Sequence, residues 1–179
     1  MFTQMIASIK ASGRKLDSME DLLIEELKDI YDAEKQIVDA LPQMEDAAWD
    51  PRVKSAFHLH LEESKRQQER LDRVFQRLDQ RPEGGSCDGM KGLIAEGTVL
   101  VKAEGDPRVK DAALLAAAQR VEHYEIAAYG SARAFANYLG RQDIADLLQQ
   151  TLDEEGDTDR KLTDLAYSGV NEQAARSGH

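Results

Sequence analysis

Residues 119–134 read QRVEHYEIAAYGSARA and combine a helical pattern with two acids at core positions. Val121, Ala128 and Ala132 recur at the spacing of one helical face, and Glu122 and Glu125 interrupt that face. A carboxylate buried without a partner costs several kcal/mol. The segment therefore predicts a helix whose core-facing side carries a polar site.

The rest of the chain favours helix as well. Ala, Leu, Glu, Gln, Lys and Arg dominate, few residues are β-branched or aromatic, and the four prolines are expected at segment edges. One long helix is predicted from about residue 19 into MEDAAWD (44–50), and three more over 51–80, 107–139 and 143–166. The fold class is therefore all-α.

Capping residues set the limits of these helices. Ser18 with Asp21 is typical of a helix start, and the segment DPRVK begins both the second helix and the third. In each copy Asp caps the helix and Pro takes its first position, where the missing N–H costs nothing. Gly140 stands where the third helix should end.

A long connection joins the second and third helices. CDGMKGLIAEGTVLVKAEGD, residues 87–106, carries apolar residues at helical spacing and predicts one short extra helix. One long crossover between two tight hairpins is the connectivity of a ferritin-like four-helix bundle. The expected organisation is an N-terminal arm over 1–17, the bundle over 18–167 and a polar tail over 168–179.

Composition excludes several classes of function. The net charge of -11 repels nucleic acid and anionic membrane surfaces. The single cysteine, Cys87, rules out an internal disulfide, and no apolar run approaches the length that a bilayer requires. The N-terminal MFTQMIASIK lacks the features of a secretory signal, so a cytoplasmic protein is expected.

Each predicted long helix carries acids on its buried face, near its middle. Antiparallel partners bring together residues equally distant from their shared turn, and Glu125 and Glu155 each lie 15 residues from Gly140. At a rise of about 1.5 Å per residue, six carboxylates and one imidazole then share one layer. The layer comprises Glu34, His60, Glu63, Glu122, Glu125, Glu155 and Asp159.

Buried acids in this number require protons, water or metal ions. Two divalent cations would supply four positive charges, and oxygen with imidazole ligands suits iron or manganese better than copper or thiolate zinc. The sequence therefore predicts a dinuclear metal site, with iron favoured and manganese as the alternative. No catalytic residue is assigned.

Several other residues receive weaker or different assignments. His58 and His123 point away from the buried stripes and are expected at the surface. Tyr31 and Tyr129 lie at stripe edges, where core packing is the favoured role. Glu154 is a weaker alternative to Glu155.

Five segments resemble the YciE/YciF-like ferritin-like family of bacterial stress-associated proteins. They are ELKDIYDAEKQI (26–37), AFHLHLEESKRQQERL (56–71), CDGMKGLIAEG (87–97), QRVEHYEIAAYGSARA (119–134) and LLQQTLDEEGDTDRKL (147–162). The resemblance covers the chain after about Asp17 and implies a ferritin-like fold, a dinuclear metal site and a homodimer. The wider di-metal pattern pairs Glu with His on two helices, whereas this chain reverses the order at His60-x-x-Glu63 and places no second histidine in the layer.

Two functions remain open at this point. In the first, the metal pair oxidises Fe(II) or consumes oxygen or peroxide, which makes the protein an oxidoreductase or a metal-handling protein. In the second, the site is coordinatively saturated, and the protein is a non-catalytic, metal-stabilised dimeric interaction module.

Overall fold

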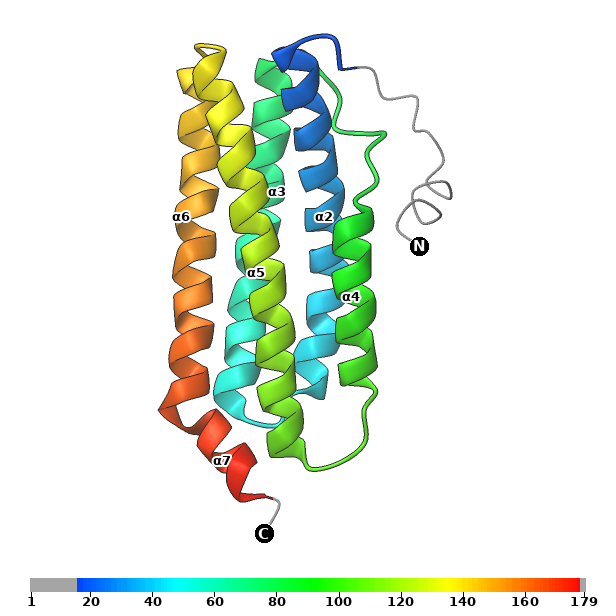
Figure 1. Ribbon diagram of the computed structural model, residues 1–179, viewed down its shortest axis with the longest axis vertical. Helices are drawn as coiled ribbons and strands as arrows, with labels where there is room; N and C mark the ends of the chain where they lie inside the picture. Colours follow the sequence, from blue (N-terminus) through cyan, green and yellow to red (C-terminus); the bar gives the residue numbers. More distant parts are fainter. Residues whose placement is uncertain (1–15, 178–179) are drawn as a thin grey trace, which may run out of the picture.

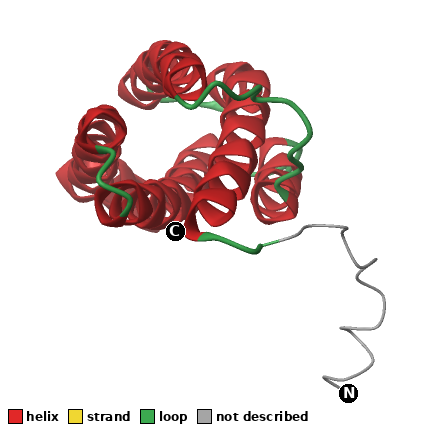
Figure 2. Ribbon diagram, turned by 90° about the horizontal axis from the view of Figure 1, so that it is seen from above, coloured by secondary structure: helices red, strands yellow, loops and turns green. Residues whose placement is uncertain are grey.

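The computed structural model describes residues 16–177, and four long helices form its body (Figure 1). They are α2 (Met19–Ala47), α3 (Pro51–Arg77), α5 (Pro107–Tyr138) and α6 (Gln142–Leu165). Figure 2 shows only helices and loops among the described residues. The all-α bundle is therefore confirmed. The predictions made for MFTQMIASIK, and for most of the arm over 1–17, lie outside the described residues.

The predicted caps are present. The Ser18 side chain accepts a hydrogen bond from the Asp21 backbone N–H, and Asp50 and Asp106 accept from the N–H two residues on. Each DPRVK segment therefore uses the same local solution, in which Asp satisfies a free N–H and Pro follows it. Past the end of α5, Gly140 adopts a positive φ of 70°, a conformation that glycine accepts without strain.

The expectation that every proline stands at a segment edge was wrong for Pro42. Pro42 lies inside α2, which continues to Ala47. Proline lacks the N–H of a helical hydrogen bond, but here it lies near the end of a helix whose residues Leu41 and Met44 are buried. Packing of these neighbours against the bundle offsets the missing bond.

The crossover contains the predicted short helix, α4 (Asp88–Val101), which packs against α2 and α5 (Figure 1). Cys87 precedes it and is buried. The backbone N–H of Cys87 donates to Asp32 at 2.8 Å, and its carbonyl accepts from Gln36 at 3.2 Å. The Tyr124 hydroxyl lies 2.9 Å from the Cys87 sulfur and donates to Asp29. These polar contacts fix the start of α4 against the bundle.

The core consists of two apolar clusters, one toward each end of the bundle. One includes Ile37, Phe57, Leu114 and Leu162, and the other includes Leu27, Leu71, Ala132 and Leu148. Buried polar side chains occupy the middle, where one cluster gives way to the other. They are Glu34, His60, Ser64, Gln67, Glu122, Glu125 and Glu155.

Beyond α6 the chain forms a π-helical turn, η1 (Ala166–Val170), and a short helix, α7 (Asn171–Arg176). Gly169 takes a φ of 126° and redirects the chain, so that α7 packs against α5. Val170 is buried there. Much of the polar tail predicted over 168–179 is thus helical.

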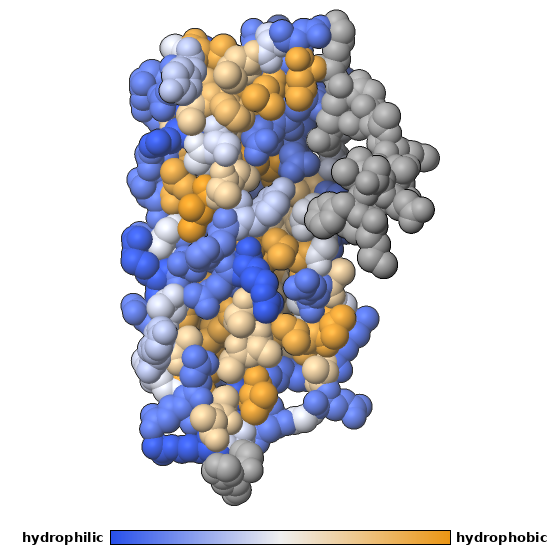
Figure 3. All heavy atoms as spheres, in the orientation of Figure 1, coloured by the Kyte–Doolittle hydropathy of each residue, from blue (hydrophilic) through white to orange (hydrophobic). Residues whose placement is uncertain are grey.

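The exposed surface is mixed in character. Figure 3 shows hydrophilic residues along much of one edge of the bundle, with apolar residues scattered between them. No helix within residues 16–177 is long and apolar enough to span a membrane.

Candidate metal centre

Four buried side chains meet in the middle of the bundle. His60 comes from α3, Glu122 and Glu125 come from α5, and Glu155 comes from α6. Each offers one ligand atom, and these four atoms lie within 4.8 Å of one another. Glu122 and Glu125 reach the same point because three residues of α-helix make nearly one turn.

Most polar atoms of this cluster lack hydrogen-bond partners among the described residues. Both oxygens of Glu122, both oxygens of Glu125 and the Oε2 atom of Glu155 are buried and unpartnered. Both ring nitrogens of His60 also lack a hydrogen bond. The Nδ1 atom lies 3.2 Å from Glu122 Oε1, but the two atoms are not aligned for one. Buried polar atoms are nearly always satisfied in folded proteins. A set of oxygen and nitrogen atoms without hydrogen bonds can serve as the ligands of a bound cation.

Glu34 approaches the cluster from α2. Its Oε1 atom accepts a hydrogen bond from the Tyr129 hydroxyl at 2.5 Å, and its Oε2 atom is buried without a partner. Glu34 is not one of the four residues within 4.8 Å of one another, but its charge raises the pKa of Glu125. The sequence predicted Tyr129 as a packing residue, and its hydroxyl also anchors this carboxylate.

Burial dominates the electrostatics of the site. Burial, followed by the charge of Glu155, raises the pKa values of Glu34, Glu122 and Glu125 well above their usual range. Burial also raises the pKa of Glu155 to about 7. Burial lowers the pKa of His60 to about 4, which keeps its imidazole neutral near pH 7. A neutral imidazole retains the lone pair that binds metals.

A hydrogen-bonded support extends from Glu155 along α3 and α6. The Gln67 amide donates to Glu155 and, at 3.2 Å, to Glu154. The Arg70 guanidinium donates to both oxygens of Glu154 and to the Thr151 hydroxyl at 2.6 Å. Glu154, the weaker alternative ligand, is therefore engaged in an ion pair.

Sequence reasoning did not single out Arg70, although it lies between Gln67 and Val74 on the buried face of α3. A charged residue on the buried face of a predicted helix was the pattern that could have identified it. Its positive charge partly opposes the rise that burial causes in the pKa of Glu34.

Glu63 and Asp159 lie beside the four-residue cluster. Glu63 accepts from the Thr158 hydroxyl at 2.9 Å and lies 3.5 Å from the Lys161 amine. Asp159 lies 3.3 Å from His123 and 3.5 Å from the Gln119 amide. The structure thus brings together His60, Glu122, Glu125 and Glu155, with Glu34 adjacent, and gives Glu63 and Asp159 other partners.

The remaining assignments concern the surface and the core. The side chains of His58 and His123 are 59% and 71% exposed, as predicted. Tyr31 packs edge-on against Phe75 with ring centroids 5.9 Å apart. It therefore has the packing role that the sequence indicated.

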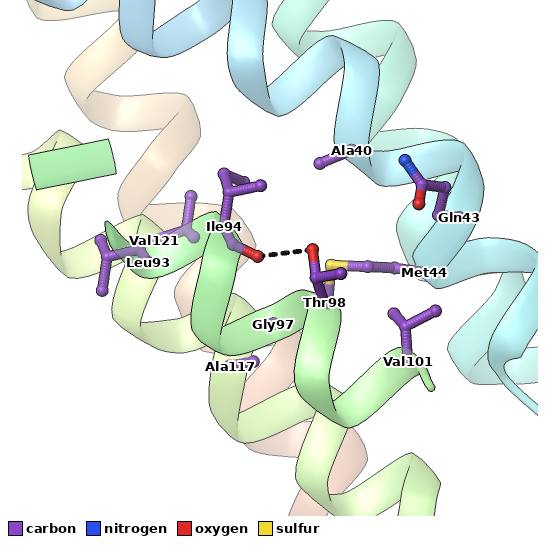
Figure 4. Close-up of a pocket in the computed structure, with 10 residues that line it drawn as sticks. All are labelled: Ala40, Gln43, Met44, Leu93, Ile94, Gly97, Thr98, Val101, Ala117 and Val121. Carbon is purple, nitrogen blue, oxygen red and sulfur yellow. Dashed lines mark hydrogen bonds between the residues drawn. The ribbon is translucent and has the colours of Figure 1, made fainter. Parts of the chain in front are cut away.

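An apolar pocket of about 20 Å³ lies where α4 meets α2 and α5 (Figure 4). Leu93, Ile94 and Val121 help to line it, and Thr98 donates a hydrogen bond to the Ile94 carbonyl at 2.8 Å. None of its lining side chains is ionisable. The pocket therefore offers no carboxylate, imidazole or thiolate ligand for a cation.

The helix order, the crossover and the buried polar layer define a helical bundle of the ferritin-like class. Residues 18–175 match the family described as Domain of unknown function (DUF892), and the chain belongs to this family.

Two bacterial relatives cover nearly the same length. The chain is 44% identical over 160 residues to Protein YciF of Escherichia coli K12, covering 89% of this chain and 96% of that protein. The crystal structure of the E. coli stress protein YciF matches with a TM-score of 0.84, over 87% of this chain and 99% of that one. The YcfI structure from Rhodopseudomonas palustris matches at 45% identity with a TM-score of 0.82. The match covers 85% of this chain and 97% of that one. The resemblance noted in the sequence is therefore confirmed.

A more distant structure shares the fold alone. A protein from Xanthomonas campestris is 20% identical, with a TM-score of 0.73 over 90% of this chain and all of that one. The bundle is thus retained where most residues differ.

Proposed function

We propose that the buried cluster holds two divalent metal ions, iron or manganese, and that the protein uses them in metal handling or in the removal of oxidants. The observation that carries the proposal is the set of buried oxygen and nitrogen atoms that have no hydrogen-bond partner. Four residues from three helices place ligand atoms within 4.8 Å of one another, and most of their polar atoms lack a hydrogen bond. Leaving so many buried polar groups unsatisfied is costly unless a cation sits among them.

Charge balance supports a pair of ions. Glu34, Glu122, Glu125 and Glu155 carry four negative charges when ionised. His60 is neutral, and Arg70 with Glu154 forms a separate ion pair at 2.7 Å. Two divalent cations would neutralise the four carboxylates, whereas one would leave a net negative charge in an apolar interior.

The donors select the kind of metal. Carboxylate oxygens with one imidazole suit iron and manganese, and no thiolate takes part. We propose Glu34, His60, Glu122, Glu125 and Glu155 as the ligands, with Glu63 and Asp159 outside them. Tyr129, through Glu34, and Gln67, through Glu155, would hold the carboxylates in position.

A bound metal pair would supply electron transfer for the oxidation of Fe(II) or for the consumption of oxygen or peroxide. The protein's own contribution is a dry, rigid site, since every proposed ligand is at most 3% exposed. The E. coli relative is described as a stress protein. A role against oxidants agrees with that description.

The alternative is a non-catalytic module whose metal ions stabilise the bundle. YcfI from R. palustris is described as a candidate structural protein, which favours this alternative. The family resemblance also predicts a homodimer, and sedimentation of the metal-loaded chain would measure it. In this alternative the surface of the dimer carries the function, and the metal centre has no open position.

Metal loading followed by turnover assays tests the proposal. Protein freed of metal would be equilibrated anaerobically with Fe(II) or Mn(II), dialysed and analysed for bound metal. We expect about two ions per chain, in line with the four carboxylates to be neutralised. Oxidation of added Fe(II), or loss of peroxide, by the loaded protein would support the oxidoreductase. Full occupancy without turnover would support the structural module, and absence of bound metal would contradict both.

A further inference from the structure

A surface groove runs between α3 and α6, beside the proposed metal centre. Its volume is about 340 Å³, and its walls combine apolar residues such as Leu59, Leu162 and Leu165 with polar and charged ones. Arg52 and Ser168 meet at one end, where the guanidinium donates to the Ser168 carbonyl. At the other end Glu63, Thr158 and Lys161 bring the helices together.

The end of the groove formed by Glu63, Thr158 and Lys161 adjoins the buried cluster. Glu63 follows His60 by three residues on α3, and Thr158 follows Glu155 by three residues on α6. In an α-helix such pairs lie next to one another on the surface. The Glu63–Thr158 contact therefore lies one helical turn from His60 and Glu155.

Exposure decreases stepwise from solvent to the cluster. The Lys161 side chain is 58% exposed, the Glu63 side chain is 19% exposed, and His60 is 3% exposed. Thr158 is buried and contributes a hydroxyl oxygen beside Glu63. Glu63 and Thr158 thus place oxygen atoms one helical turn from the residues with unpartnered atoms, His60 and Glu155.

Charged groups in the groove also act on residues of the buried cluster. The negative charge of Glu63 acts on Glu155, and the positive charge of Lys161 acts on His60. The Lys161 amine lies 3.5 Å from Glu63, at the long end of contact distances. A half-exposed ion pair of this kind contributes little to stability and separates readily.

We infer that Glu63 is the point at which metal ions reach the buried site from the α3–α6 groove, with Lys161 as the cation that they displace. The inference rests on the proposed metal centre and assigns its route of access. A divalent ion pairs with the Glu63 carboxylate in place of the Lys161 amine. It then passes Thr158 to the free donors of the cluster.

A second acid provides a matched comparison. Asp159 also lies one turn from Glu155, but on the side facing α5, where His123 and Gln119 contact it. The neighbouring surface hollow is lined by Arg120 and by no carboxylate, whereas the α3–α6 groove presents Glu63 and Asp164 beside its two cations. We therefore expect uptake through Glu63 and not through Asp159.

The test measures the rate of uptake separately from the amount bound. Metal-free protein would be mixed rapidly with Co(II) at low ionic strength, and cobalt absorbance would be followed over time. Glu63→Gln keeps the acceptor for Thr158 and removes the charge, so we expect about tenfold slower uptake with unchanged final stoichiometry. Lys161→Met should load faster than the unmodified protein, and Asp159→Asn should load at the unmodified rate.

Several outcomes would overturn the inference. Loading of Glu63→Gln at the unmodified rate, or slow loading of Asp159→Asn, would place the route elsewhere. A lower final stoichiometry in Glu63→Gln would make Glu63 a ligand. If the unmodified protein bound no cobalt, iron or manganese, the metal centre itself would fail and the route with it. Circular dichroism of each variant would check that its helices remain intact.

Discussion

At the scale of single residues, the site depends on carboxylates that are expensive to bury. Glu34 and Glu125 come from different helices, and neither has its full set of hydrogen bonds. Glu125 has both oxygens free, whereas Glu34 has one oxygen fixed by Tyr129. Removing both side chains therefore tests the ligand assignment with little other damage to the bundle.

The first prediction concerns the double variant Glu34→Ala with Glu125→Ala. It should lose stoichiometric uptake of iron or manganese, because half of the proposed anionic ligands are gone. Its helicity should change little, because a buried acidic layer without metal is itself unfavourable. Elemental analysis and circular dichroism would measure the two effects.

A control with the same change of charge is available at the surface. Glu62 and Glu172 are exposed and pair with Lys65 and Arg176. Replacing both by Ala should leave metal content unaltered. Equal metal content in the buried double variant and the unmodified protein would refute the choice of ligands.

The sequence located most of the buried polar layer at this scale. Glu34, Glu122, Glu125 and Glu155 were predicted because they interrupt apolar stripes at matching depth. The same reasoning placed Glu63 and Asp159 in the layer, whereas both have partners nearer the surface. A helical wheel gives the direction of a side chain only to within a fraction of a turn. It therefore does not show whether a side chain at the contact between two helices points to the core or to the surface. The support by Arg70 depends on contacts between α3 and α6, which local pattern does not contain.

At the scale of elements, the crossover helix α4 shows how closely local sequence and packing are linked. Gly89 lies against Tyr124, and a Cβ atom there would approach the ring to 2.8 Å. Gly92, three residues further along the same helix, has nothing within 4 Å of such an atom. One helix thus contains a glycine required by packing and a glycine that is not.

The second prediction compares Gly89→Ala with Gly92→Ala. Gly92→Ala should raise the free energy of unfolding by about 0.5–1 kcal/mol, because Ala loses less backbone entropy in a helix than Gly does. Gly89→Ala should lower it by about 1–3 kcal/mol, because the new methyl group displaces the Tyr124 ring from its contacts with Cys87 and Asp29. Urea denaturation would measure both, and equal effects in the two variants would refute the packing argument.

Element limits were predictable wherever a cap defines them. Ser18, Asp50 and Asp106 start their helices as the sequence indicated, and the crossover helix was predicted from its apolar spacing. Pro42 was misjudged because helix continuation there depends on tertiary burial of Leu41 and Met44. The packing of Val170 after Gly169 likewise depends on α5, which residues 168–179 alone do not reveal.

At the scale of the whole molecule, the buried acids determine how stability depends on pH. Burial raises the pKa values of Glu34, Glu122 and Glu125, and it raises the pKa of Glu155 to about 7, so the folded metal-free protein keeps protons on carboxyl groups at pH values where the unfolded chain has released them. When the folded state binds more protons than the unfolded state, stability falls as pH rises. His60 acts in the opposite direction, but mainly between its folded pKa of about 4 and its usual value of 6.5.

The third prediction follows from this balance. Between pH 6.5 and 8 the metal-free protein should become less stable as pH rises, by at most about 1.4 kcal/mol per pH unit for each carboxyl group still protonated. With saturating Mn(II) the trend should weaken or reverse, because metal binding displaces those protons and strengthens with pH. Thermal unfolding at fixed ionic strength, with and without Mn(II), would measure this. Metal-free stability that rises across this range would contradict the electrostatics described for the cluster.

The most direct measurement of the central claim is anomalous X-ray diffraction from crystals equilibrated with Mn(II), collected at the manganese absorption edge. We expect two anomalous peaks in the middle of the bundle, bonded to atoms of Glu122, Glu125, Glu155 and His60, with Glu34 at one of them. Peaks confined to surface carboxylates, with only water among these buried side chains, would contradict the account.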